Sequence, residues 1–519
     1  MKIKLYDRQK NQVKILDYPP GTYRVQDILT DQGYGLETPC NCLGICGKCR
    51  VKVSGDLSQP TDLEKSLNLL DQGIRLACTT YIMGDASIDY QVQAGDLEVS
   101  DLALQVQAYD GQGEALITSI GLAFDVGTTG VTGQVVDLKR GIALNHKSIL
   151  NPQTQYGHDV LSRITYAKDH PSGTETLQEV ILEGIKGLTG DLLAAYNKDQ
   201  VKGVALAGNT TMQHLIKGVN PVSLSRAPYQ PVFLERQSLE GDILGLEGLD
   251  LHLLPSASSF VGADIVCGLY ALQKDENIDL SKALFIDIGT NGELVTLHEG
   301  NLVATSTAAG PALEGMNIMC GMRAEAGAID SFKIHLDGSL HYSTIKGKVA
   351  RGICGSGLID LIAELVDKGI VKKSGQFNKT MDDRYSAYMK DKKFYLTPEV
   401  YLSQKDIRQI QLAKAAIASG ISLLYDHLAI KAETCQRVII AGSFGFHLSE
   451  TSLRKIGLIP QSITCPIDFV GNTALKGAGL SLMGNDHLEG LDHLSQNIHV
   501  LDLSRHENFQ EAFVKALTF

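Results

Sequence analysis

The residues that most directly indicate chemistry are four cysteines: Cys40, Cys46, Cys49 and Cys78. Five residues separate the first from the second and two separate the second from the third, whereas the fourth follows much later, in the run RLACTT. Thiolates at this spacing can surround an inorganic core while the distant cysteine completes the set of ligands. The sequence therefore predicts an iron–sulfur centre held by the loop PCNCLGICGKC and by Cys78.

The identity of one ligand stays open, and the thiols admit two other uses. The spacing PCxxxGxCGKC matches [2Fe-2S] ferredoxins and favours Cys40 as the first ligand, with Cys42 as the alternative or as a free thiol beside the cluster. A structural zinc site more often shows two CxxC pairs, and a disulfide framework is less favoured in a long chain without a secretory segment. Gly44 and Gly47 allow positive φ and let backbone amides point at the sulfurs.

Length and composition limit the class of protein. The chain has 519 residues, which favours two to four domains, and its 52 glycines without tryptophan suit an α/β protein with many tight turns. The formal net charge of −12 argues against nucleic acid or an anionic membrane surface as the main partner. No apolar run is long enough to span a bilayer, and MKIKLYDRQK is more typical of an exposed strand than of a signal peptide. We therefore expect a cytoplasmic protein.

Residues 1–93 are predicted to form a small α+β domain. Alternating apolar residues in KIKLY and VKIL indicate a hairpin, followed by a helix in VQDILTDQG, a strand in RVKVSG, a helix in LEKSLNLL and a last strand in ASIDYQV. This order resembles the β-grasp fold of plant-type and adrenodoxin-like ferredoxins. Residues 94–118 show no sustained period and are predicted to be a linker.

The larger remaining region contains an internal repeat. GLAFDVGTTGVTGQVVDL, with Asp125, and ALFIDIGTNGELVTLHEG, with Asp287, share the pattern DxGTxG at a separation of 162 residues. An aspartate at the end of a buried strand can hold Mg²⁺ through water. The glycines and threonines after it let backbone N–H groups and hydroxyls approach phosphate oxygens. Two facing copies would clamp the triphosphate of a nucleotide from both sides.

Three further segments stand in an order that strengthens this interpretation. FVGADIVCGLYAL at 260–272 and GNTALKGAGL at 471–480 are helix patterns rich in small residues, which suit a hinge where two helices cross closely. RVIIAGSFGFHL at 437–448 is a buried strand that enters a glycine loop. The set resembles the superfamily of acetate and sugar kinases, heat-shock chaperones and actin. The predicted fold is multidomain: a β-grasp [2Fe-2S] ferredoxin domain followed by a two-lobed α/β ATPase, with lobes at 119–280 and 281–519.

The superfamily resemblance implies roles for the residues of these loops. Asp125 and Asp287 are implied as catalytic carboxylates that meet metal and phosphate. Contact with the nucleotide is implied for Thr128, Thr129, Gly289, Thr290, Asn291, Gly292, Gly442, Ser443 and Gly445, of which the last three would lie against the nucleoside. Glu293 is predicted to orient the attacking water, although a carboxylate after such a turn often faces solvent or pairs with a neighbour.

The combination of the two parts narrows the resemblance. A [2Fe-2S] domain ahead of such an ATPase resembles the reductive activators of corrinoid-dependent enzymes, as do the segments NPQTQYGHDVLSRI, GNTTM, DIGTNGE, AAGPALEGMNIMCGMRAEAGAID and GICGSGLID. The resemblance implies that ATP drives one electron from the cluster to the Co(II) corrinoid of a methyltransferase-system protein and restores Co(I). It also implies an upstream reductant and a homodimer. Larger members insert a separate middle domain, and the linker here is too short to hold one.

Two regions carry ionisable residues without a settled role. Asp264 opens the first small-residue helix and is either a site residue or a helix N-terminal acid. The glycine-rich stretch 308–330 carries Glu314, Arg323 and Glu325. The resemblance places this stretch near the cleft or the partner face and assigns no role to its residues.

The two parts also belong together energetically. Returning cobalt to Co(I) needs a very low potential, whereas a plant-type cluster lies near about −400 mV. Moving one charge against 100 mV costs about 2.3 kcal/mol. An unaided ferredoxin therefore cannot reduce the cobalt if the cobalt potential lies one or two such intervals below that of the cluster. A nucleotide-driven conformational change can supply this free energy if the lobes bind the two cobalt states differently.

Three other functions fit part of the sequence. A small-molecule kinase regulated by a ferredoxin unit would phosphorylate a small acceptor, but no obvious sugar or carboxylate site is present. An ATP-dependent electron donor to another low-potential enzyme, such as a radical dehydratase, is less favoured because known activators of that kind use a different cluster arrangement. A redox-sensing module would bind ATP without partner-stimulated hydrolysis.

Overall fold

Two compact units make up the part of the chain that the computed structural model describes. The described residues are 1–7, 12–32, 34, 36, 42, 44, 47–67, 69–90, 118–275, 277–442 and 448–519. By their internal contacts they divide into Met1–Asp96 with Pro152–Tyr166, and Leu97–Asn151 with Ala167–Phe519. Apart from Thr118, the predicted linker lies outside the described residues.

The smaller unit contains a mixed sheet with the strand order β2-β1-β6-β4-β5, and β3 also pairs with β6. Its elements are β1 (Lys2–Asp7), β2 (Gln12–Asp17), β3 (Tyr23–Arg24), α1 (Val25–Asp31), β4 (Arg50–Leu57), α2 (Asp62–Ser66), β5 (Ile74–Leu76) and β6 (Tyr81–Tyr90). The predicted hairpin is β1 with β2, and β1 pairs in parallel with β6. Ile28 and Leu29 of α1 join Ile3, Leu5 and Ile88 of the sheet in one buried core.

Two boundaries in this unit differ from the prediction. The helix predicted in LEKSLNLL ends at Ser66, because a 3₁₀ turn at Leu70–Gln72 and Gly73 (φ 68°) reverse the chain. The reversal lets Arg75 reach the buried carboxylate of Glu64, with Nε and Oε1 2.9 Å apart. The last strand begins at Tyr81, earlier than predicted, because its first residues pair with β3.

The larger unit contains two six-stranded sheets of matching design. The first has the order β11-β12-β10-β7-β8-β9 and the second β23-β22-β13-β14-β15-β24. In each sheet a three-stranded antiparallel meander is extended by a parallel strand beside its first strand, β10 beside β7 and β22 beside β13. The two DxGTxG copies therefore occupy equivalent turns of a repeated structure.

The elements of this part of the chain are as follows. The first sheet comprises β7 (Ile120–Val126), β8 (Gly130–Asp137), β9 (Ile142–Leu150), β10 (Val201–Gly208), β11 (Gln237–Glu240) and β12 (Asp250–Leu253). The second comprises β13 (Lys282–Ile288), β14 (Gly292–His298), β15 (Asn301–Thr307), β22 (Arg437–Ala441), β23 (Ile467–Gly471) and β24 (Ile498–Val500). Two smaller sheets comprise β16 (Ala328–Ile334), β17 (Leu340–Thr344), β18 (Gly352–Ile353), β19 (Met389–Lys390), β20 (Lys393–Tyr395) and β21 (Tyr401–Ser403). The helices of the larger unit are α4 (Gly173–Leu192), α5 (Thr210–Ile216), α6 (Ala263–Gln273), α7 (Gly355–Asp367), α8 (Gln404–His427), α9 (Glu450–Lys455), α10 (Thr473–Ser481), α11 (Asn485–Asn497) and α12 (Phe509–Ala516). Most of α3 (Val160–Asp169) belongs to the smaller unit.

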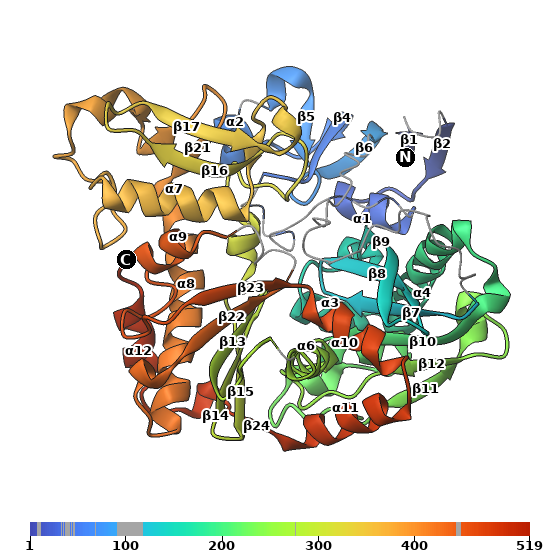
Figure 1. Cartoon of the computed structure of the whole chain (residues 1–519). Coiled ribbons are helices and arrows are strands. Elements are labelled where there is room, and N and C mark those ends of the chain that lie inside the picture. The colour runs from blue at the N-terminus through green and yellow to red at the C-terminus, as the bar shows by residue number, and fades with distance from the viewer. Residues whose placement is uncertain are drawn as a thin grey trace. The chain divides into compact units, whose positions relative to one another are not determined.

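The two small-residue helices, α6 and α10, lie side by side between the large sheets (Figure 1). One buried cluster joins them to Ala123 of the first sheet and Phe285 of the second. A Cβ at Gly477 of α10 would lie 2.1 Å from the backbone oxygen of Cys267 in α6. The predicted close crossing of these helices is therefore confirmed, and it depends on glycine at this position.

Gly477→Ala is expected to lower the thermal unfolding midpoint, because overpacking a close contact typically costs about 1–3 kcal/mol. Gly187→Ala in α4 is the matched control, since a Cβ there meets nothing within 4 Å. Alanine is favoured over glycine in a helix interior by about 1 kcal/mol, so this variant should be as stable as the parent or more stable. Equal midpoints for the two variants, measured by differential scanning calorimetry, would contradict the tight crossing.

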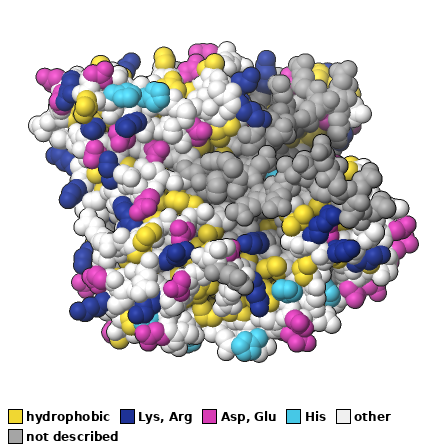
Figure 2. All heavy atoms as spheres, in the orientation of Figure 1, with side chains coloured by type: hydrophobic (Ala, Val, Ile, Leu, Met, Phe, Trp, Pro, Cys, Tyr) yellow, Lys and Arg dark blue, Asp and Glu magenta, His cyan; other side chains and the backbone are white. Residues whose placement is uncertain are grey.

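The surface carries both basic and acidic side chains. On the face drawn in Figure 2, Lys and Arg side chains are interspersed with Asp and Glu over the described residues. Among those residues, none of the helices combines the length and the apolar character that crossing a bilayer requires.

Candidate functional site

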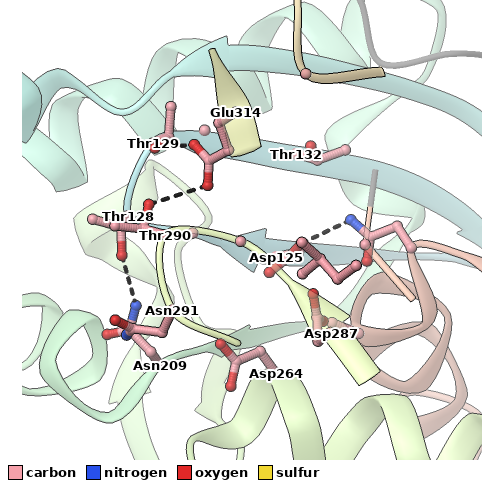
Figure 3. A pocket seen from close by; sticks show the side chains of 18 of the residues that line it. Asp125, Thr128, Thr129, Thr132, Asn209, Asp264, Asp287, Thr290, Asn291 and Glu314 are labelled. Carbon is pink, nitrogen blue, oxygen red and sulfur yellow. Dashed lines mark hydrogen bonds between the residues drawn. The ribbon is translucent and has the colours of Figure 1, made fainter. Parts of the chain in front are cut away.

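The two DxGT loops are the turns between β7 and β8 and between β13 and β14, as predicted. A backbone hydrogen bond closes each one, from Gly127 N to Gly130 O and from Gly289 N to Asn291 O, both 2.9 Å. Both turns line one cavity of about 280 Å³ between the two large sheets (Figure 3). The structure thus brings the predicted phosphate loops face to face.

Three aspartates line this cavity: Asp125, Asp264 and Asp287. Burial raises the pKa of Asp125 to about 6, against a hydrogen bond from Asn472 that lowers it. Burial, and then the charge of Asp125, raise the pKa of Asp264 to about 7. Burial, and then the neighbouring carboxylates, raise the pKa of Asp287 to about 8. Asp264, which the sequence left ambiguous, therefore belongs to the same carboxylate group as the two predicted aspartates.

The carboxylate group fits a hydrated divalent cation. Within the part of the chain that the structure describes, no three His, Cys, Asp or Glu side chains converge as direct metal ligands. Mg²⁺ keeps several of its waters and binds through few carboxylates, so contact through water suits this arrangement. Burial is the main cause of these raised pKa values, and a divalent cation would offset it by favouring the ionised carboxylates.

The predicted residues occupy different places around the cavity. The lining includes both aspartates, Thr128, Thr129, Gly289, Thr290, Asn291, Glu293 and Gly442. Gly292 begins β14 and does not line it; a Cβ there would lie 2.8 Å from Thr307 Oγ1. Ser443 and Gly445 lie outside the described residues. The carboxylate of Glu293 accepts a hydrogen bond from Ser306 Oγ at 3.0 Å, and burial raises its pKa well above the ordinary value.

Two asparagines that the sequence analysis did not select hold the loops in place. Asn209 Nδ2 donates to Thr128 Oγ1 at 3.1 Å, and Asn472 Nδ2 donates to Asp125 Oδ2 at 2.7 Å. Each also caps the helix that it precedes through its side-chain oxygen. The signal was present in the sequence, because both stand in a Gly-Asn-Thr tripeptide directly after a strand, in GNTTM and GNTALKG. Glu314 is a third unassigned residue that lines the cavity.

The raised pKa values predict how stability depends on pH. Asp125, Asp264 and Asp287 hold their protons to about pH 6, 7 and 8 in the folded state but release them near 3.8 when unfolded. The unfolded state then binds fewer protons between these values, so the free energy of unfolding falls as pH rises from about 4 to 8. Metal-free protein should melt at a lower temperature at pH 8 than at pH 6. In Asp287→Asn this difference should shrink, and an unchanged difference would contradict the assignment.

The cluster region shows two of the four predicted ligands. Cys49 and Cys78 are buried, with relative exposures of 1% and 4%, and their Sγ atoms lie 3.2 Å apart. Two buried thiols side by side are what a shared iron requires, although its tetrahedral geometry would set the two sulfurs slightly further apart. Cys40 and Cys46 lie outside the described residues, so the choice between Cys40 and Cys42 stays a prediction.

Local structure holds Cys49 and Cys78, the two described residues of the predicted ligand set, in place. The Glu64 carboxylate accepts hydrogen bonds from Arg75 Nε and from the Leu76 backbone N–H, both at 2.9 Å, just before Cys78. Ala77 N donates to Cys49 O at 2.8 Å and ties the two cysteine segments together. Gly44 and Gly47 have φ of 70° and 66°, which confirms the predicted positive values.

Three models of known protein families match successive parts of the chain. The family model described as "2Fe-2S iron-sulfur cluster binding domain" matches residues 9–83. The model described as "RACo middle region" matches residues 120–277, and the one described as "C-terminal domain of RACo the ASKHA domain" matches residues 281–519. These matches confirm the predicted fold class.

Three relatives are similar over most of their length. The "Corrinoid activation enzyme RamQ" of Eubacterium limosum is 32% identical over 427 residues, covering 77% of this chain and 70% of the relative. The "[Co(II) methylated amine-specific corrinoid protein] reductase" of Methanosarcina barkeri is 24% identical over 447 residues, with 77% of each chain covered. A solved structure titled "Reductive activator for corrinoid,iron-sulfur protein" superposes with a TM-score of 0.70 at 28% identity, covering 100% of this chain and 98% of that one.

These matches correct the expectation of a missing middle domain. The range matched by the middle-region model, 120–277, nearly coincides with the predicted first ATPase lobe, 119–280. The solved relative is covered over 98% of its chain, so little of it lacks a counterpart here. The short linker is therefore no sign that this region is absent.

Proposed function

Since the chain belongs to the RACo family, we propose that it uses ATP to return the inactive Co(II) corrinoid of a methyltransferase-system protein to Co(I), with one electron supplied through its own [2Fe-2S] cluster. One observation carries the proposal. The same chain holds two buried, adjacent cysteines of the predicted ligand set and two facing phosphate loops around one cavity. When bound, the cluster supplies a low-potential one-electron carrier.

The residues of the cavity are assigned as follows. Thr128, Thr129, Thr290 and the loop amides bind the phosphates, and Asp125 and Asp287 hold Mg²⁺ through water. Gly442, at the end of β22, lies beside the nucleoside; its φ is 93°, and a Cβ there would lie 2.8 Å from Asp287 Oδ1. The crossing of α6 and α10 is the hinge about which the lobes respond to the nucleotide.

The proposal also specifies where the protein acts, what reduces its cluster and in which oligomeric state it works. It includes a cytoplasmic location, an upstream reductant that refills the cluster and a homodimer. A kinase with the same fold would transfer phosphate to a small acceptor, whereas this proposal requires release of ADP and inorganic phosphate.

The deciding experiment is anaerobic and optical. Protein with a reconstituted, reduced cluster is mixed with a Co(II) corrinoid protein from the same organism, and the cobalt absorption bands are followed with and without MgATP. Growth of the Co(I) band only with hydrolysable ATP is the expected result. No Co(I) with an intact cluster and several corrinoid proteins would overturn the proposal and favour another low-potential acceptor.

A further inference from the structure

Glu314 joins the two phosphate loops. Its carboxylate accepts a hydrogen bond from Thr290 Oγ1 at 3.1 Å and another from Thr129 Oγ1 at 3.4 Å (Figure 3). Thr129 belongs to the loop of the first sheet and Thr290 to that of the second. The carboxylate therefore uses the same two hydroxyls that a terminal phosphate held by both loops would need.

The backbone at Glu314 is held firmly. This residue ends the 3₁₀ turn Pro311–Glu314, and the preceding Leu313 is fully buried in the core that includes α7 and α8. Gly315 follows with φ of 80°, and a Cβ there would lie 2.5 Å from the backbone oxygen of Met322. The carboxylate can therefore move by side-chain rotation while its base stays in place.

The charges around Glu314 differ from those around Glu293. Burial raises the pKa of the Glu314 carboxyl, against smaller lowering effects of the hydrogen bond from Thr290 and of the charge of Arg323, which lines the same cavity. The carboxylate of Glu293 instead accepts from Ser306 of the adjacent strand, and its residue pairs across the hairpin with Asp287. Glu293 is thus held by its own sheet, whereas Glu314 reaches both loops.

We propose that Glu314 is the catalytic carboxylate of ATP hydrolysis. As the terminal phosphate takes over the two threonine hydroxyls, the carboxylate turns to the attacking water, orients it and accepts its proton. The water oxygen bonds to the γ-phosphorus while the bond from that phosphorus to the β,γ-bridging oxygen breaks. ADP leaves with the electron pair, and the proton passes from Glu314 to solvent. The inference rests on the ATPase part of the proposed function and not on the corrinoid partner.

The test is Glu314→Gln in single-turnover hydrolysis of labelled ATP, with protein in excess and no corrinoid protein. The expected result is hydrolysis at least about 100-fold slower, the usual size of a general-base contribution. Binding of MgATP, measured by isothermal titration calorimetry, should be unchanged or tighter, because the amide removes a negative charge that faces the phosphate. Glu325→Gln is the matched control: it lies in the same stretch, does not line the cavity and should keep the parent rate.

Three outcomes would overturn the assignment. They are parent-like hydrolysis by Glu314→Gln, loss of MgATP binding by that variant, and loss of the chemical step in Glu293→Gln but not in Glu314→Gln. If Glu314→Gln does not fold, Glu314→Asp gives the same test, because it keeps the charge but withdraws it by one methylene and should slow hydrolysis without weakening MgATP binding. The two proposals can be tested separately. If the protein hydrolyses ATP through Glu314 but reduces no cobalt, this result contradicts only the corrinoid function and leaves the role of Glu314 in place.

Discussion

Replacing Cys78 by serine is expected to remove the visible absorption of the [2Fe-2S] cluster and to abolish electron transfer, while MgATP binding persists. Cys78 is buried beside Cys49, with the two Sγ atoms 3.2 Å apart, and serine does not supply the thiolate that iron requires. Iron content, the absorption spectrum and titration calorimetry with MgATP measure the three effects. Cys465→Ser is the control, since that thiol lies far from the cluster loop in sequence and donates a hydrogen bond to Cys435 Sγ at 3.5 Å.

A companion pair of variants decides the open ligand. If Cys40 is the first ligand, Cys42→Ala keeps the cluster and Cys40→Ala loses it. The reverse result would move that assignment to Cys42 without changing the expectation for Cys78. A cluster that survives Cys78→Ser would contradict the proposed ligand set itself.

Asp287→Asn is expected to slow MgATP hydrolysis by about 10²- to 10³-fold, because a bound cation supplies several kcal/mol of charge stabilisation in such reactions. In metal-free protein the pKa of Asp287 is raised to about 8, and a divalent cation binds the ionised form. Asparagine keeps the shape but not the charge, so the apparent affinity for Mg²⁺ should fall as well. Steady-state phosphate release over a range of Mg²⁺ concentrations measures both effects.

The control for this variant is Asp191→Asn, which changes an exposed aspartate on α4 with 64% of its side chain accessible. It should leave hydrolysis unchanged. A double variant of Asp125 and Asp287 should lose less than the sum of the single losses, because both act on the same cation. Equal hydrolysis by Asp287→Asn and Asp191→Asn would contradict a role for Asp287 in the metal site.

Local patterns in the sequence were sufficient to predict much of the local structure of this protein. The strand–turn–strand at each DxGT copy follows from apolar residues that end at Asp125 and Asp287, with glycine and threonine in the turn. Positive φ at Gly44 and Gly47 follows from residue type and the need for a tight loop. Such features depend on neighbours along the chain, so the order of residues contains the information that determines them.

Tertiary structure decided which distant residues complete the site. Asn472 reaches Asp125 across 347 positions of sequence, and Glu314 reaches Thr129 across 185. Asp264 joins the carboxylate group only because its helix is packed between the two sheets. No spacing rule links these residues in the sequence. Their proximity and their raised pKa values arise when the two sheets close on one buried cavity, since burial and neighbouring charge exist only in the folded chain.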